Sequence, residues 1–169
     1  YYNIKNTGRP AENIVMMNDI EVGAGQFSLG ATSYHLDAGS EPLFPFGFGL
    51  SYAQFRYSTP TLSSNEMNMN STITVSCNIT NISKIDAYET VQLYIRDHVG
   101  SLCRPIRELK DFKKILIKAG ETQTVSFEID ADMLAFYHND MKSYAETGYF
   151  SLWVAPNAKS GEEIRFILK

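Results

Sequence analysis

Strict alternation of apolar and polar residues over one short segment is the strongest constraint on the fold of this chain. Within residues 71–82, Ile73, Val75, Cys77 and Ile79 are apolar and the residues between them are polar. Successive side chains of a β-strand point to opposite faces of the sheet. The segment is therefore predicted to be a strand with one buried face, in which Cys77 is a small core hydrophobe.

The same two-residue period recurs along the rest of the chain, with turn-forming residues between the segments. The expected strands are residues 55–57, 71–82, 89–96, one or two within 107–117, 125–129, 148–154 and 164–168. In the penultimate strand, Phe150, Leu152 and Val154 are expected on one face, with Tyr149, Ser151 and Trp153 on the other. Asp130 is a candidate N-cap for one helical turn. About seven short strands predict an all-β fold, an immunoglobulin-like or fibronectin type III-like antiparallel β-sandwich over residues 53–169.

Residues 44–52, here called the linker, differ from everything after them. Phe44, Phe46 and Phe48 alternate with one proline and two glycines, and Leu50 and Tyr52 continue the apolar pattern. Aromatic side chains bury large areas, so such a segment is expected to lie against other protein. Two interpretations remain open: an ordered connector between two packed bodies, or a hydrophobic loop within one core.

Residues 1–43 show no clear periodicity, which is long for a loop inside one compact domain. They are expected to be a largely irregular segment that completes a neighbouring α/β domain and then enters the linker. The chain starts Tyr1-Tyr2-Asn3 without a methionine, which suggests a cut inside a longer protein.

Composition excludes several classes of partner. The net charge is −4 over 169 residues, so no broad basic surface for nucleic acid is expected. No apolar run approaches the roughly 20 residues that a membrane-spanning helix needs. His35, His98 and His138 are scattered without metal-ligand spacing, so they are expected in loops or on the surface, with no metal and no cofactor. Cys77 and Cys103 are expected to be free thiols.

Two polar patterns have simple structural interpretations. Asn70, Asn78 and Asn81 begin glycosylation-type triplets, and Asn and Thr on an exposed strand face explain them. A basic stretch is expected to be a solvated edge strand protected by charge. Its members are Arg104, Arg107, Lys110, Lys113 and Lys114.

Several motifs together resemble the C-terminal region of glycoside hydrolase family 3, the β-glucosidase and β-xylosidase family. They are PLFPFGFGLSY at 42–52, NITN at 78–81, VQLYI at 91–95, RPIRELK at 104–110, KAGET at 118–122 and GYF at 148–150. Upstream, YYN at 1–3 and NTGRP at 6–10 resemble the end of that family's α/β domain. The resemblance implies a fibronectin type III-like domain preceded by its linker, in a periplasmic or secreted protein.

The resemblance also implies that catalysis belongs to upstream domains of the same polypeptide. A retaining glycosidase needs two carboxylates about 5–5.5 Å apart, and neither catalytic motif of the family has a counterpart here. The chain is therefore expected to contain no catalytic residue, and oligo- or aryl-β-glycosides are expected to bind only the intact enzyme. Tyr34 and Asp37, just before the linker, are weak candidates for contacts near the substrate. The acidic residues expected in isolated or solvated positions are Glu108, Asp111, Glu121, Glu128, Asp130 and Asp132.

Three functions from different classes remain. The first is a structural interdomain module of a glycoside hydrolase, which predicts that Phe44, Phe46, Phe48 and Tyr52 are buried or form an exposed apolar patch in a fragment. The second is a carbohydrate-binding module, which requires exposed coplanar aromatics. The suggestive pairs are Trp153 with Tyr149 and Tyr88 with Tyr94. The third is an adhesive sandwich that recognises another protein through a sheet edge.

Overall fold

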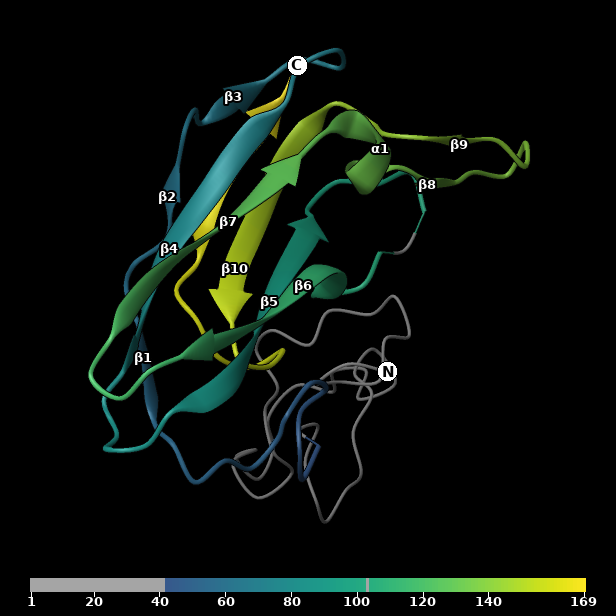
Figure 1. Ribbon diagram of the computed structural model, residues 1–169. Helices are drawn as coiled ribbons and strands as arrows, with labels where there is room; N and C mark the ends of the chain where they lie inside the picture. The colour runs from purple at the N-terminus through teal and green to yellow at the C-terminus, as the bar shows by residue number, and fades with distance from the viewer. Residues whose placement is uncertain (1–41, 103) are drawn as a thin grey trace, which may run out of the picture.

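A computed structural model describes residues 42–102 and 104–169, which fold as two facing β-sheets (Figure 1). The first sheet is built on the alternating strand β4, Ile73–Asn81, which pairs antiparallel with β7, Thr122–Ile129. Two short strands, β1 (Phe55–Tyr57) and β2 (Thr61–Leu62), also pair antiparallel with β4. The strand predicted from the period-two pattern is thus the centre of its sheet.

The second sheet has five strands in the order β3-β11-β10-β5-β6. Their bounds are Glu66–Met67 for β3, Ile164–Leu168 for β11, Gly148–Ala155 for β10, Ala87–Asp97 for β5 and Glu108–Ile117 for β6. Pairing is antiparallel except between β3 and β11. The β5–β6 register shifts at Leu93/Tyr94, a bulge that the sequence pattern did not predict.

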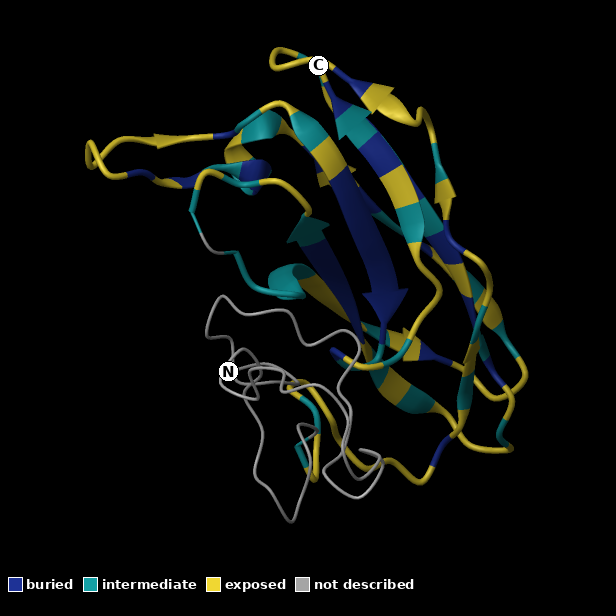
Figure 2. Ribbon diagram, turned by 180° about the vertical axis from the view of Figure 1, so that it is seen from behind, coloured by how far each residue is buried: buried dark blue, intermediate teal, exposed yellow. Residues whose placement is uncertain are grey.

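The core lies between the sheets and is formed by the inward positions of the alternating strands (Figure 2). Val75, Ile79, Leu93, Phe127 and Leu152 are all fully buried there. The Cys77 side chain is also buried and is a free thiol, as predicted. The predicted all-β sandwich is confirmed.

One helical turn and a small hairpin connect β7 to β10. The turn is α1, Ala131–Leu134, and the Asp130 carboxylate accepts a hydrogen bond from the Met133 N–H at 2.8 Å, as expected of an N-cap. Strands β8 (Phe136–Tyr137) and β9 (Ser143–Tyr144) then form a hairpin that projects from the sandwich in Figure 1. In the described part of the chain, no helix has the length and apolar character needed to cross a membrane.

Candidate interdomain docking site

The linker is attached to the sandwich through its backbone. The Phe46 carbonyl accepts hydrogen bonds from the Ala158 N–H at 2.9 Å and from the Tyr94 hydroxyl at 3.4 Å. The next carbonyl, that of Gly47, accepts one from the Gln92 side-chain amide at 3.2 Å. Two successive carbonyls are therefore held by side chains of β5 and by the loop after β10.

Gln92 is the centre of this attachment. Its Nε2 also donates to the Pro156 carbonyl at 2.6 Å, and its Oε1 accepts from the Tyr94 hydroxyl. Gly47 has φ +76°, and a Cβ there would lie 2.0 Å from Gln92 Oε1. Only glycine allows the linker backbone to come this close.

A small cluster on the outer face of β5 and β10 supports the linker. Tyr94, Trp153 and Ala158 are buried there and pack with Leu109 of β6. The Arg107 guanidinium lies 4.1 Å from the centroid of the Trp153 ring and donates to the carbonyls of Ala158 (2.9 Å) and Ser160 (2.7 Å). This face of the sheet is covered, so β5 and β10 are buried on both faces where the linker docks.

This burial corrects the proposed sugar-binding aromatic pairs. Tyr149 and Tyr88 are exposed, but their partners Trp153 and Tyr94 are buried at 5% and 0% exposure. Neither pair offers two open rings to a sugar. The alternation pattern correctly predicted that Trp153 lies on the outward face of its strand, but the linker and Arg107 cover that face.

The side chains of the linker, in contrast to its backbone, face outward. Phe44 (62%), Phe46 (44%) and Phe48 (42%) remain substantially exposed, and Leu50 and Tyr52 almost fully so. Phe44 and Phe48 stack with ring centroids 5.1 Å apart, and the Phe48 N–H donates to the Pro45 carbonyl at 3.1 Å. The linker is thus an ordered turn that presents an apolar surface, one of the two outcomes expected for an interdomain module.

A cleft of about 560 Å³ lies between the linker and the β5–β6 part of the sheet. The linker side includes Phe46 and Leu50, and the sheet side includes Tyr88, Leu109 and Phe112. Tyr88 (60%) and Phe112 (59%) are exposed, so the apolar surface continues from the linker across the cleft onto the sheet.

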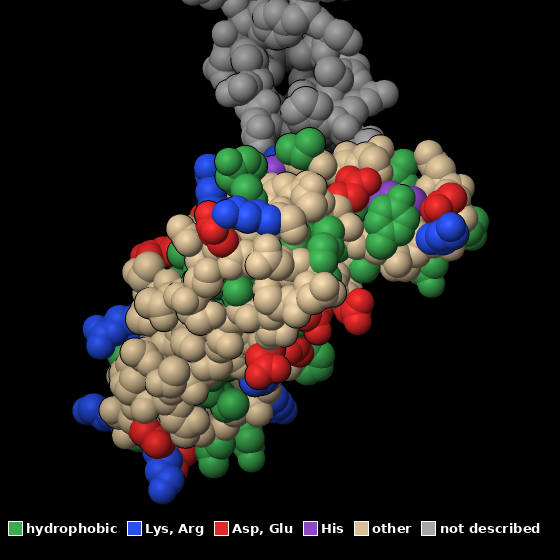
Figure 3. Space-filling model, turned by 90° about the horizontal axis from the view of Figure 1, so that it is seen from above, with side chains coloured by type: hydrophobic (Ala, Val, Ile, Leu, Met, Phe, Trp, Pro, Cys, Tyr) green, Lys and Arg blue, Asp and Glu red, His purple; other side chains and the backbone are tan. Residues whose placement is uncertain are grey.

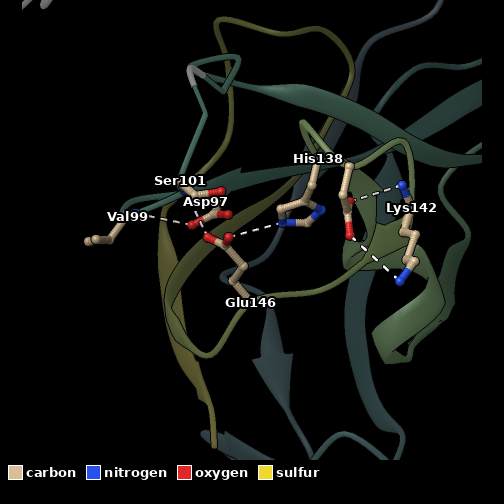
Figure 4. A network of polar contacts seen from close by, with 7 residues as sticks. Asp97, Val99, Ser101, His138, Lys142 and Glu146 are labelled. Atoms are coloured by element: carbon tan, nitrogen blue, oxygen red, sulfur yellow. Dashed lines mark hydrogen bonds and ion pairs between the residues drawn. The ribbon is translucent and has the colours of Figure 1, made fainter.

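A polar network at the β8–β9 hairpin, shown in Figure 4, is the second feature of interest. His138 Nε2 lies 2.9 Å from Glu146 Oε1, and the other Glu146 oxygen accepts from the Ser101 N–H at 2.8 Å. Hydrogen bonding to Ser101 holds the pKa of Glu146 below its usual value. The network therefore ties the hairpin to the loop between β5 and β6.

His138 lies in the loop between β8 and β9, as expected of a surface or loop histidine, but it is buried rather than on the surface. It is 7% exposed, and its ring lies between those of Phe136 (4.2 Å) and Tyr144 (3.6 Å). The Arg104 guanidinium stacks on Phe136 at 4.2 Å. His138 packs the hairpin together, and within the described residues no cluster of His, Cys, Asp and Glu could hold a metal ion.

Lys110, Lys113 and Lys114 of the basic stretch lie on β6, which is an edge strand as predicted. The two arginines precede β6 and are not merely solvated. Arg104 bonds Glu108 at 2.7 Å, and Arg107 covers Trp153. On the face of the molecule seen in Figure 3, acidic and basic side chains are interspersed.

Asn78 is exposed as expected, whereas Asn81 is fully buried, which corrects its assignment to an exposed face.

The acidic side chains considered for catalysis are dispersed. Glu108 pairs with Arg104 and Lys110, Glu121 accepts from the Lys118 N–H, and Asp130 caps α1. Glu128 and Asp132 are exposed, and Asp111 accepts the Phe112 N–H. Tyr34, Asp37, His35 and Cys103 lie outside the described residues, so their predicted roles stay predictions.

Comparison with known proteins agrees with this architecture. Residues 89–158 match the family model described as "Fibronectin type III-like domain". A β-xylosidase from Formosa agariphila is 45% identical over 121 residues, which cover 72% of this chain and 17% of that protein. A periplasmic β-glucosidase from Salmonella typhimurium is 40% identical over 154 residues, covering 91% of this chain and 19% of that protein.

The solved structures include a β-glucosidase from Listeria innocua in complex with isofagomine. It matches with a TM-score of 0.81 and 33% identity, over 99% of this chain and 22% of that one. The chain carries the fibronectin type III-like domain of family 3 glycoside hydrolases. It spans less than a fifth of the length of the first curated relatives it matches.

Proposed function

We propose that this chain is the non-catalytic, C-terminal interdomain module of a family 3 glycoside hydrolase. In the longer polypeptide, upstream domains hydrolyse terminal β-D-glycosyl residues, and this module packs against them through the linker. The Salmonella relative is named a periplasmic enzyme, and we propose a periplasmic or secreted location here as well.

One observation carries this proposal: the linker backbone is fixed while its aromatic side chains are exposed. The carbonyls of Phe46 and Gly47 are held by Ala158, Tyr94 and Gln92. Ordering a chain segment costs conformational entropy. An ordered segment that leaves three phenylalanines open to water is best explained by a partner that covers them.

The test compares this chain with the same chain extended through its own upstream domains. We expect hydrolysis of aryl β-glucosides by the extended protein and none by the 169-residue chain. Hydrolysis by the short chain would contradict a non-catalytic role, and an inactive, folded extended protein would contradict the glycosidase assignment.

Changing Phe44, Phe46 and Phe48 together to Ser tests the packing role. The triple variant is expected to lower the melting temperature of the extended protein while changing that of the short chain little, because the rings are exposed in it. The control is Val99, Tyr137 and Met141 to Ser, apolar side chains elsewhere on the domain that are even more exposed, at 70%, 70% and 79%. An equal effect of both triple variants on the extended protein would argue against docking through the linker.

A further inference from the structure

We propose that the cleft beside the linker is a second half of the docking surface, and that its occupant is an apolar part of the upstream α/β domain. This proposal rests on the proposed function and specifies the partner of the same site. It extends that site from the linker onto the outer face of β5 and β6.

The first argument is continuity of the surface. Phe46 and Leu50 of the linker line one side of the cleft, and Tyr88, Leu109 and Phe112 line the other. Tyr88 and Phe112 lie on neighbouring strands and remain about 60% exposed. Leu116, paired with Tyr88 across β5–β6, adds a further exposed apolar side chain. A partner that covers the linker would be adjacent to all of them.

The second argument is the state of the polar groups at the cleft. Gln92 uses its amide on the carbonyls of Gly47 and Pro156, and its Oε1 on the Tyr94 hydroxyl. Glu89 accepts the Tyr57 hydroxyl at 2.7 Å, and the Lys114 ammonium lies 5.3 Å from the Tyr88 ring centroid. A sugar needs convergent polar groups to bind its hydroxyls, and those of Gln92 and Glu89 are already engaged. The cleft suits apolar side chains better than a glycan.

The third argument is tethering. Phe46 is held to the sheet, and residue 41 is five residues before it. At about 3.6 Å per extended residue, residue 41 lies at most about 18 Å from this anchor. By the proposed function the upstream domain precedes the linker on the same polypeptide, and a short connection of this kind gives it an effective concentration of about millimolar at the cleft. This favours the same polypeptide over a second copy of the chain.

Cysteine labelling tests the occupant directly. Phe112→Cys places a thiol in the cleft, and Glu128→Cys, on the exposed side of β7 in the other sheet, is the matched control. Both substitutions are made in a Cys103→Ser chain, because Cys103 is expected to be a free thiol, and they are compared with that chain, in which Cys77 is buried. We expect maleimide labelling at residue 112 to slow about tenfold or more when the chain is extended through its upstream domains, because docking shields the site. Labelling at residue 128 should stay within about twofold.

The outcomes are distinguishable. Unchanged labelling at residue 112 in an extended, active enzyme overturns the cleft proposal and leaves the proposed function standing. An extended protein without glycosidase activity removes the proposed function whatever the labelling shows. Protection of residue 112 in the short chain that grows with its concentration identifies a second copy as the occupant instead. Protection of the short chain by β-linked gluco-oligosaccharides identifies a glycan, and either result overturns the proposal.

Discussion

The side-chain amide of Gln92 donates to the carbonyl of Gly47 over 3.2 Å and so joins the sandwich to the linker, 45 residues away in sequence. The same nitrogen donates to the Pro156 carbonyl at 2.6 Å. Gln92 is 5% exposed, so these bonds are shielded from water. One buried side chain thus sets the path of the linker and the position of the loop after β10.

Replacing Gln92 with Ala is expected to release the linker. The change removes both donated bonds and the acceptor of the Tyr94 hydroxyl, and should lower the free energy of unfolding by about 1–3 kcal/mol. Chymotrypsin should also cut faster beside the linker phenylalanines. Thr90→Ala, at the preceding outward and exposed position of β5, is the control. Unchanged cleavage in the Gln92 variant would show that the linker is held by other contacts.

The two linker glycines make a second, internally controlled prediction. Gly47→Ala should destabilise the docked linker by at least about 1–2 kcal/mol, because φ is +76° and the new Cβ would lie 2.0 Å from Gln92 Oε1. Gly49→Ala should have little effect, because no heavy atom lies within 4 Å of the position of its Cβ. Urea unfolding of both variants measures the difference. Similar losses at the two positions would contradict this geometry.

Much of the fold could be predicted because its strands alternate. The pattern of Ile73 to Ile79 gave the central strand of one sheet, and Asp130 marked the start of α1. These features depend on local periodicity and capping, which a single sequence displays directly.

The candidate docking site could be predicted only in part. The linker was recognisable from its phenylalanines, but Gln92, Tyr94, Arg107 and Trp153 were not identified as the groups that hold it. Alternation predicts one open face, and here a distant segment covers that face. One signal was present in the sequence: residues 91–95 and 150–155 carry apolar or aromatic residues on both faces. The structure buries both segments without interruption. Such runs indicate strands buried on both sides.

Asn81 provides a third prediction, on stability. It is fully buried, its Nδ2 donates to the carbonyls of Ile85 (2.8 Å) and Ile117 (3.0 Å), and its Oδ1 accepts from the Ser83 N–H at 3.0 Å. Asn81→Ala leaves these backbone groups without partners and should cost about 2–4 kcal/mol in urea unfolding. Asn78→Ala, on the exposed face of the same strand, should cost less than about 1 kcal/mol. Equal costs would mean that water replaces the lost Asn81 bonds.

Glu89 gives a prediction about pH. Burial raises the pKa of Glu89, and the hydrogen bond from the Tyr57 hydroxyl only partly opposes this effect. Between the ordinary pKa of 4.5 and the higher value of the folded state, the native protein binds more protons than the unfolded chain. The contribution of Glu89 to stability is therefore greatest below this window and falls as the pH rises through it.

Glu89→Gln removes this titration, and the amide oxygen can still accept the Tyr57 hydroxyl. The variant should gain stability relative to the wild type as the pH rises from 4 to 7, measured by urea unfolding at each pH. Glu128→Gln, which changes an exposed carboxylate on β7, serves as the control. Tyr57→Phe should make the loss of stability steeper, because the hydroxyl that favours the ionised carboxylate is removed. If the free energy of unfolding varied with pH in the same way for the wild type and Glu89→Gln, burial of the ionised Glu89 carboxylate would cost no stability.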